Sequence, residues 1–161
     1  MDGMSLMEDA SIILDSHRTM AISTVRPDGW PQTTIVGYAN VSLTLYFLIF
    51  RSGQKFANIQ HDNRISIAVG EEPRYLRDAK AVYSGARATE VTDPKLREAA
   101  WSLLMQRHPN LAEYVLPESA DAAMMRADCQ YLSVLDYTKG FGNTKAFSIA
   151  TGDAQTGGVT Q

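Results

Sequence analysis

Four polar residues at the end of an apolar segment are the clearest candidates for binding chemistry in this chain. Arg51, Ser52, Gln54 and Lys55 directly follow the apolar run 43–50. The apolar spacing after them predicts a short helix that begins at this point. A helix N-terminus carries free backbone N–H groups and a partial positive charge, so two cations and a hydroxyl group there suit an anion. The pattern predicts a phosphate site held by charge-assisted hydrogen bonds.

An ordinary surface helix, capped by Ser52 and flanked by solvated Arg51 and Lys55, explains the same residues. Exposed cations of this kind contribute little to stability and need no ligand. Spacing alone favours this alternative, so the phosphate site depends on the elements that would position it.

The elements before the junction are a helix and a hairpin. Apolar residues at helical spacing predict a helix over 5–17, with Ser5 and Glu8 as a candidate capping box. Extended patterns predict strands over 20–25 and 32–38. The sequence Arg-Pro-Asp-Gly at 26–29 lies between these strands and is typical of a tight turn, which predicts an antiparallel hairpin.

The remaining elements are also mainly strands. Asp93 and Pro94 have the types expected of a helix cap and first turn, and Gly85 is expected to mark a bend or bulge. The expected order is a turn at 40–42, a strand at 43–50, a helix at 52–61, strands at 64–69 and 79–91, a helix at 93–107, a polar and partly helical connection at 108–127, and strands at 130–137 and 145–149. Short antiparallel strands at this spacing predict an α+β, mainly β chain that forms a small barrel with flanking helices.

Composition limits the functional classes. The chain has 161 residues with 15 Lys and Arg against 18 Asp and Glu, a net charge of −3 that argues against nucleic-acid binding. The single cysteine, Cys129, excludes a disulfide within the chain, and the three histidines have no metal-ligand spacing. We expect one domain over 1–150, a flexible tail over 151–161, no membrane span or metal, and a cytoplasmic location.

Five segments in order then identify a family. Residues 24–31 are Thr-Val-Arg-Pro-Asp-Gly-Trp-Pro, and residues 53–59 are Gly-Gln-Lys-Phe-Ala-Asn-Ile. Residues 63–67 are Asn-Arg-Ile-Ser-Ile, residues 80–85 are Lys-Ala-Val-Tyr-Ser-Gly, and residues 139–142 are Lys-Gly-Phe-Gly. Over about residues 15–150 the chain resembles the pyridoxamine 5'-phosphate oxidase-like family of flavin-binding split barrels.

The resemblance implies a homodimeric split β-barrel with two FMN sites between the subunits. It implies that the junction holds the phosphate group, that the first hairpin lies along the flavin ring, that a later strand adds a polar contact, and that the partner subunit covers the ring. Carried over to this chain, the cofactor-binding residues are Ile22, Ser23, Thr24, Arg51, Ser52, Gln54, Lys55, Lys80 and Phe141. No catalytic side chain is expected, because the flavin supplies the redox chemistry.

Departures from the family pattern narrow the expected activity. Gly53 and Gln54 stand where the family has Ser and Arg, and Thr19 and Thr24 stand where the authentic oxidase has Arg and Lys. The C-terminal Arg-Leu-x-Pro segment of that oxidase is also missing, which argues against oxidation of pyridoxine 5'-phosphate. We expect an FMN-dependent oxidoreductase acting on an unidentified small molecule. The alternatives are a non-catalytic flavin or haem binding or sensing protein and a deazaflavin-dependent reductase.

Overall fold

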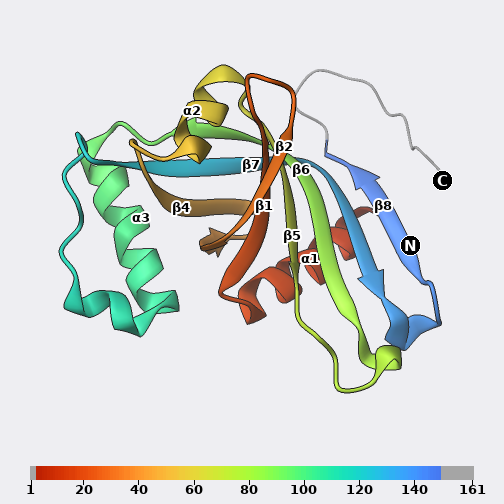
Figure 1. Cartoon of the computed structure of the whole chain (residues 1–161). Coiled ribbons are helices and arrows are strands. Elements are labelled where there is room, and N and C mark those ends of the chain that lie inside the picture. Colours follow the sequence, from red (N-terminus) through yellow and green to blue (C-terminus); the bar gives the residue numbers. More distant parts are fainter. Residues whose placement is uncertain (1–2, 150–161) are drawn as a thin grey trace.

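The strands form one curled antiparallel sheet in a computed structural model that describes residues 3–149 (Figure 1). The strand order is β2-β1-β5-β6-β7-β4-β3, with β8 paired to β7. The strands are β1 (Thr19–Val25), β2 (Pro31–Gly37), β3 (Ala39–Val41), β4 (Thr44–Phe50), β5 (Arg64–Gly70), β6 (Lys80–Glu90), β7 (Ala122–Asp136) and β8 (Thr144–Ser148). The helices are α1 (Gly3–Ser16), α2 (Gln54–His61) and α3 (Pro94–Arg107), with 3₁₀ turns at Leu76–Asp78, Pro109–Glu113 and Tyr137–Lys139.

The long strand β7 curls the sheet into a half-barrel. One edge of β7 pairs with β6 over most of its length, while its other edge pairs first with β4 and then with β8. Inward-facing side chains such as Ile22, Phe47 and Leu132 form the main core, and α1 adds Leu14 to it. The mainly β half-barrel with flanking helices confirms the expected fold class.

Turn-forming and helix-capping residues predicted several local features correctly. The register between β6 and β7 shifts at Gly85, where β7 carries the extra residue of a β-bulge. Asp93 caps α3 by accepting hydrogen bonds from the backbone N–H groups of Lys95 and Leu96. The hairpin of β1 and β2 is antiparallel, as its turn residues predicted.

Four local predictions were wrong. Ser5 lies inside α1, which begins at Gly3, and α2 is preceded by Gly53 with no side-chain cap, so Ser52 is not the cap. The strand β3 pairs with β4 where only a turn was expected at 40–42. β7 begins at Ala122 rather than at 130; its first residues pair with β4, and their side chains are buried in the main core on one face and in the α3 cluster on the other. The predicted tail over 151–161 lies outside the described residues.

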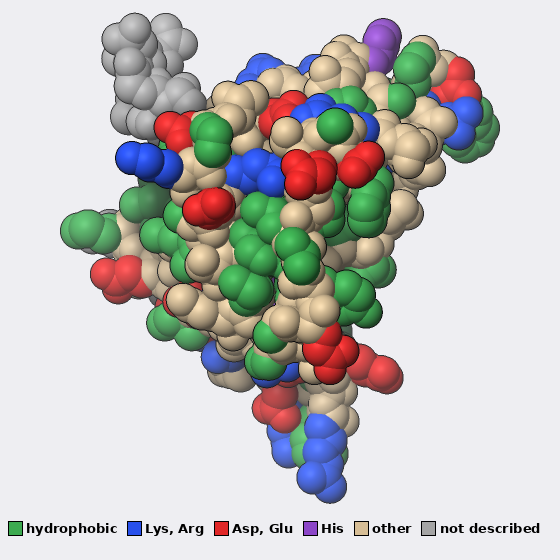
Figure 2. Space-filling view, turned by 90° about the vertical axis from the view of Figure 1, so that its left-hand side faces the viewer, with side chains coloured by type: hydrophobic (Ala, Val, Ile, Leu, Met, Phe, Trp, Pro, Cys, Tyr) green, Lys and Arg blue, Asp and Glu red, His purple; other side chains and the backbone are tan. Residues whose placement is uncertain are grey.

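A second apolar cluster attaches α3 to the outside of the half-barrel. Trp101 and Leu104 of α3 pack with Ala39 and Met124. Figure 2 views the side of the molecule that carries α3, where hydrophobic side chains gather near the middle and acidic and basic ones lie mainly above and below them. Among the described residues, none of the helices has the length and apolar character needed to span a membrane.

Tyr38 gives the fold a dependence on alkaline pH. Its side chain is fully buried and its hydroxyl donates a 2.6 Å hydrogen bond to the backbone carbonyl of Leu14, and this burial raises its pKa. The unfolded chain releases the tyrosine proton near pH 10 whereas the folded chain keeps it, so the free energy of unfolding falls as the pH rises above about 10. We expect the urea midpoint to drop between about pH 9.5 and about pH 11.5, and to drop less in Tyr38→Phe. An equal drop in both proteins would contradict this assignment.

Candidate functional site

The junction of β4 and α2 presents an uncapped helix N-terminus with a lysine beside it. Gly53 precedes α2 in extended conformation and provides no side chain to cap the helix. The first N–H groups of a helix have no partner within it, so they remain available here. Lys55 is half-buried and has neither an ion pair nor a side-chain hydrogen bond within residues 3–149. Burial lowers the pKa of Lys55, because the charged ammonium group loses part of its hydration.

Arg51 is already paired with groups of this chain. Its guanidinium forms an ion pair with Glu90, and its Nε donates a 2.6 Å hydrogen bond to the backbone carbonyl of Ser119. The guanidinium also lies 5.1 Å from the ring centre of Phe56. Arg51 therefore ties the end of β4 to the end of β6, and the cation with no partner at this junction is Lys55.

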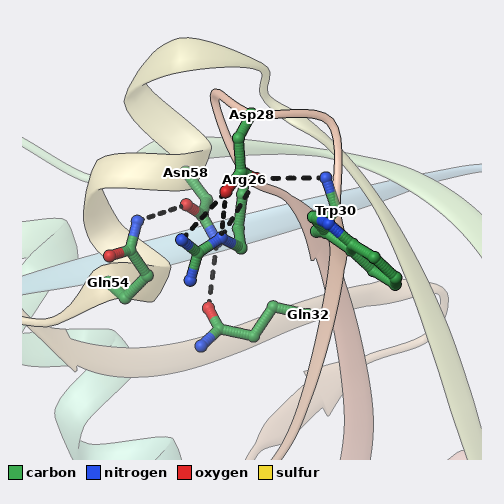
Figure 3. A network of polar contacts seen from close by, with 6 residues as sticks. All are labelled: Arg26, Asp28, Trp30, Gln32, Gln54 and Asn58. Carbon is green, nitrogen blue, oxygen red and sulfur yellow. Dashed lines mark hydrogen bonds and ion pairs between the residues drawn. The ribbon is translucent and has the colours of Figure 1, made fainter.

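A buried amide attaches α2 to the β1–β2 hairpin (Figure 3). Asn58 is fully buried, and its Nδ2 donates to the hydroxyl of Thr24 at 2.9 Å and to Oε1 of Gln32 at 3.0 Å. Its Oδ1 accepts a 2.8 Å hydrogen bond from Nε2 of Gln54. Two of the expected cofactor residues, Thr24 and Gln54, are thus joined through Asn58. The sequence analysis did not predict Asn58. The available signal was that Asn58 lies four residues after Gln54, which places both side chains on the same face of a helix.

A shallow hollow of about 260 Å³ lies on the outer face of the sheet and includes Ser23. The cross-strand register places Thr33, Ser23, Ser66, Gly85 and Tyr131 in one row across β2, β1, β5, β6 and β7. The hydroxyl groups of Ser23 and Thr33 are 2.7 Å apart. The row therefore offers several hydroxyl groups on a floor made of small side chains.

The neighbouring row on the same face is more apolar. It runs through Ile35, Ala21, Ala68 and Tyr83. Ala21, Ala68 and Tyr83 line the hollow together with the first row, and Ile35 is 69% exposed. Small residues thus form the floor of the hollow, and Tyr83 and Tyr131 stand at its edge.

The other expected site residues lie elsewhere in the fold. Ile22 points into the core, so only its backbone can face a ligand outside the sheet. Lys80 is five residues from Gly85 along β6, which places it about 17 Å from the row of Ser23. Its Nζ lies 4.0 Å from Oδ2 of Asp136. Phe141, in the turn between β7 and β8, is 83% exposed and contacts Tyr137. The structure thus brings together Thr24 and Gln54, and it separates Lys80 and Phe141 from them.

A larger cavity of about 420 Å³ lies at the opposite end of the sheet, between α1 and the β5–β6 loop. Its lining includes Lys80, His17 and several carboxylates. Nδ1 of His17 is 2.7 Å from the backbone carbonyl of Ile13, while its buried Nε2 has no hydrogen-bond partner in the described structure. Apart from Lys80, none of the expected site residues lines this cavity.

Residues 3–149 contain no accessible thiol and no cluster of metal-binding side chains. Cys129 is buried, and burial raises its pKa, so the thiol is held in its unreactive form. Residues 3–149 contain no group of three or more His, Cys, Asp or Glu placed to hold a metal ion.

Comparisons with known proteins bear on the family and on the fold. A family model described as pyridoxamine 5'-phosphate oxidase matches residues 6–135. A comparison with curated proteins found no match.

Several solved structures share the fold. A haem binding protein from Mycobacterium smegmatis superposes with a TM-score of 0.75 at 18% identity over 88% of this chain, which spans only 57% of that protein. General Stress Protein 26 from Bacillus anthracis str. Sterne has a TM-score of 0.68 at 19% identity, covering 89% of this chain and 98% of that one. A FAD-binding protein from Mesorhizobium loti has a TM-score of 0.64 at 21% identity, covering 83% and 94%.

Proposed function

Because the chain belongs to the pyridoxamine 5'-phosphate oxidase family, we propose that it binds FMN and acts as an oxidoreductase on a small molecule. Bound FMN would supply hydride or electron transfer, while the protein supplies binding, orientation and electrostatics. The observation that carries the proposal is Lys55, a half-buried cation without a counter-ion at an uncapped helix N-terminus. This combination suits a phosphate group, which would compensate both the lysine charge and the free N–H groups.

The flavin ring is assigned to the hollow around Ser23 on the outer face of the sheet. A planar ring can lie against a floor of small side chains, and the hydroxyl groups of Ser23, Thr33 and Ser66 can serve the polar edge of the ring. This fit concerns shape and hydrogen-bonding capacity. The remaining expected contacts, Lys80 and Phe141, are too distant within one chain and would have to act through a second subunit.

The hollow also argues for a homodimer. Its volume of about 260 Å³ is below the range of about 300–1,000 Å³ usual for ligand pockets. Exposed Ile35, Tyr83 and Tyr131 surround it on the same face of the sheet. A second copy packed on this face would bury these side chains and close the site over the ligand.

The direct test is to purify the protein and measure its absorption spectrum and its binding of FMN. We expect flavin absorption, release of FMN on denaturation, one FMN per chain, and sedimentation at twice the mass of one chain. A colourless protein that shows no change of FMN fluorescence on titration would contradict the proposal. Binding of the deazaflavin coenzyme in preference to FMN would support the related alternative.

Haem is the second candidate ligand, because one structural neighbour is described as haem binding. His17 and His108 are partly buried, and each has one ring nitrogen within hydrogen-bond distance of a backbone carbonyl, Nδ1 of His17 at 2.7 Å and Nε2 of His108 at 2.9 Å. His61, at the end of α2, is the exposed histidine that could ligate an iron. A shifted Soret band on haem titration that disappears in His61→Ala would favour haem over FMN.

A further inference from the structure

Tyr131 and Gly85 form a pair on the outer face at the bulge between β6 and β7. The two residues are register partners, and the bulge follows directly after them. A Cβ added to Gly85 would overlap the Cε1 and Cζ atoms of Tyr131 and would lie 2.6 Å from its hydroxyl oxygen. The outer end of the tyrosine ring therefore lies over Gly85, in the space that any side chain there would fill.

This placement directs the tyrosine ring toward the hollow. Gly85 is followed in its row by Ser66 and Ser23, so a ring that crosses Gly85 reaches from β7 over β6 toward the floor of the hollow. Tyr131 lines the hollow and remains 52% exposed, so one part of the ring is fixed by Gly85 and another part is free for contact. Gly85 therefore has two roles. It lies at the bulge between β6 and β7, and its lack of a side chain leaves room for the Tyr131 ring.

We propose that Tyr131, held in place by Gly85, is a wall of the binding site and contacts the flavin ring directly. The inference rests on the proposed function and adds a specificity residue to it. Offset or edge-on contact between aromatic rings contributes about 0.5–1.5 kcal/mol beyond the area that it buries. The phenol ring would also quench the fluorescence of a flavin in contact with it, which a purely structural tyrosine would not do.

The experiment compares variants of Tyr131 by FMN titration and by the emission of bound FMN. Tyr131→Ala is expected to weaken binding about 2- to 12-fold and to brighten the bound flavin. Tyr131→Phe is expected to keep the affinity, because the aromatic contact remains, and to brighten the flavin, because the phenol is gone. Tyr114→Ala is the control, since Tyr114 is 65% exposed and lies outside the hollow.

A double-mutant cycle separates two roles of Gly85, which are to leave room for the Tyr131 ring and to form the bulge. Gly85→Ala should weaken FMN binding in the native background by displacing the Tyr131 ring, and should have no further effect in Tyr131→Ala. Equal effects in both backgrounds would overturn the link between the two residues. If the wild type binds FMN, and both Tyr131 variants bind it with the same affinity and the same flavin emission as the wild type, this inference alone would be overturned. A change only in the sedimentation of Tyr131→Ala would likewise overturn it in favour of a subunit contact, and absence of FMN binding by the wild type would overturn the proposed function as well.

Discussion

Lys55→Ala is expected to weaken FMN binding about 5- to 150-fold, the equivalent of about 1–3 kcal/mol for a lost hydrogen bond to a charged group. The size of the effect follows from the surroundings of the lysine. Lys55 is half-buried without a counter-ion, and Arg51 nearby is already paired with Glu90. Lys55 would therefore be the residue that provides a full positive charge to the phosphate group.

Riboflavin makes this experiment specific to the phosphate group. Lys55→Ala should lower the affinity for FMN and leave the affinity for riboflavin unchanged, because riboflavin has the same ring and no phosphate. Lys55→Arg should retain part of the FMN affinity. The matched control is Lys95→Ala, since Lys95 also lies in the first turn of a helix but is exposed, and its helix is already capped by Asp93.

Two results would contradict the phosphate site at this junction. One is unchanged FMN affinity in Lys55→Ala. The other is an equal loss of FMN and riboflavin binding, which would indicate that Lys55 supports the fold of α2 or contacts the ring. Loss of FMN affinity in Lys95→Ala would point to a long-range effect of net charge rather than to a site.

Features of the fold could be predicted from the sequence where they depend on the properties of single residues. The Asp93 cap and the Gly85 bulge depend on conformational preferences of single residues, so the sequence indicated both. The start of β7 could not be found in this way. Ala123 and Met125 face the main core, whereas Met124 packs in the α3 cluster on the opposite face. Because both faces of this end of β7 are covered, its residues are all buried and lack the alternation that marks a half-exposed strand.

The candidate site was predictable only in part, for a related reason. The junction is contiguous in sequence, so Arg51, Ser52, Gln54 and Lys55 could be predicted together as candidates for a phosphate site. The contact between Tyr131 and Gly85 depends on a register across two strands 46 residues apart, which no local pattern contains. The pairing of Arg51 with Glu90 depends likewise on the curl of the sheet, which brings the end of β4 to the end of β6.

Asn58→Leu is expected to lower the free energy of unfolding by about 1–3 kcal/mol, because it removes a fully satisfied buried amide. Leucine has the same branched shape with two larger methyl groups, so the substitution leaves no cavity and removes the hydrogen bonds. Thr24 is only 2% exposed and its hydroxyl would lose its partner in a place that water does not reach. The amides of Gln32 and Gln54 are nearer the surface and can bond to water instead.

Urea denaturation measures this loss, and Gln54→Ala provides the matched control. Gln54 contributes the outermost bond of the same network and is exposed, so its removal should cost less than about 1 kcal/mol. Asn58→Leu should also weaken FMN binding in the folded protein more than Gln54→Ala does, because only Asn58 attaches α2, and with it Lys55, to the hairpin that carries Ser23. Equal urea midpoints for the two variants would contradict the role of Asn58 in stability. Equal FMN affinities at unequal stabilities would show that the position of α2 relative to the hairpin does not govern the phosphate site.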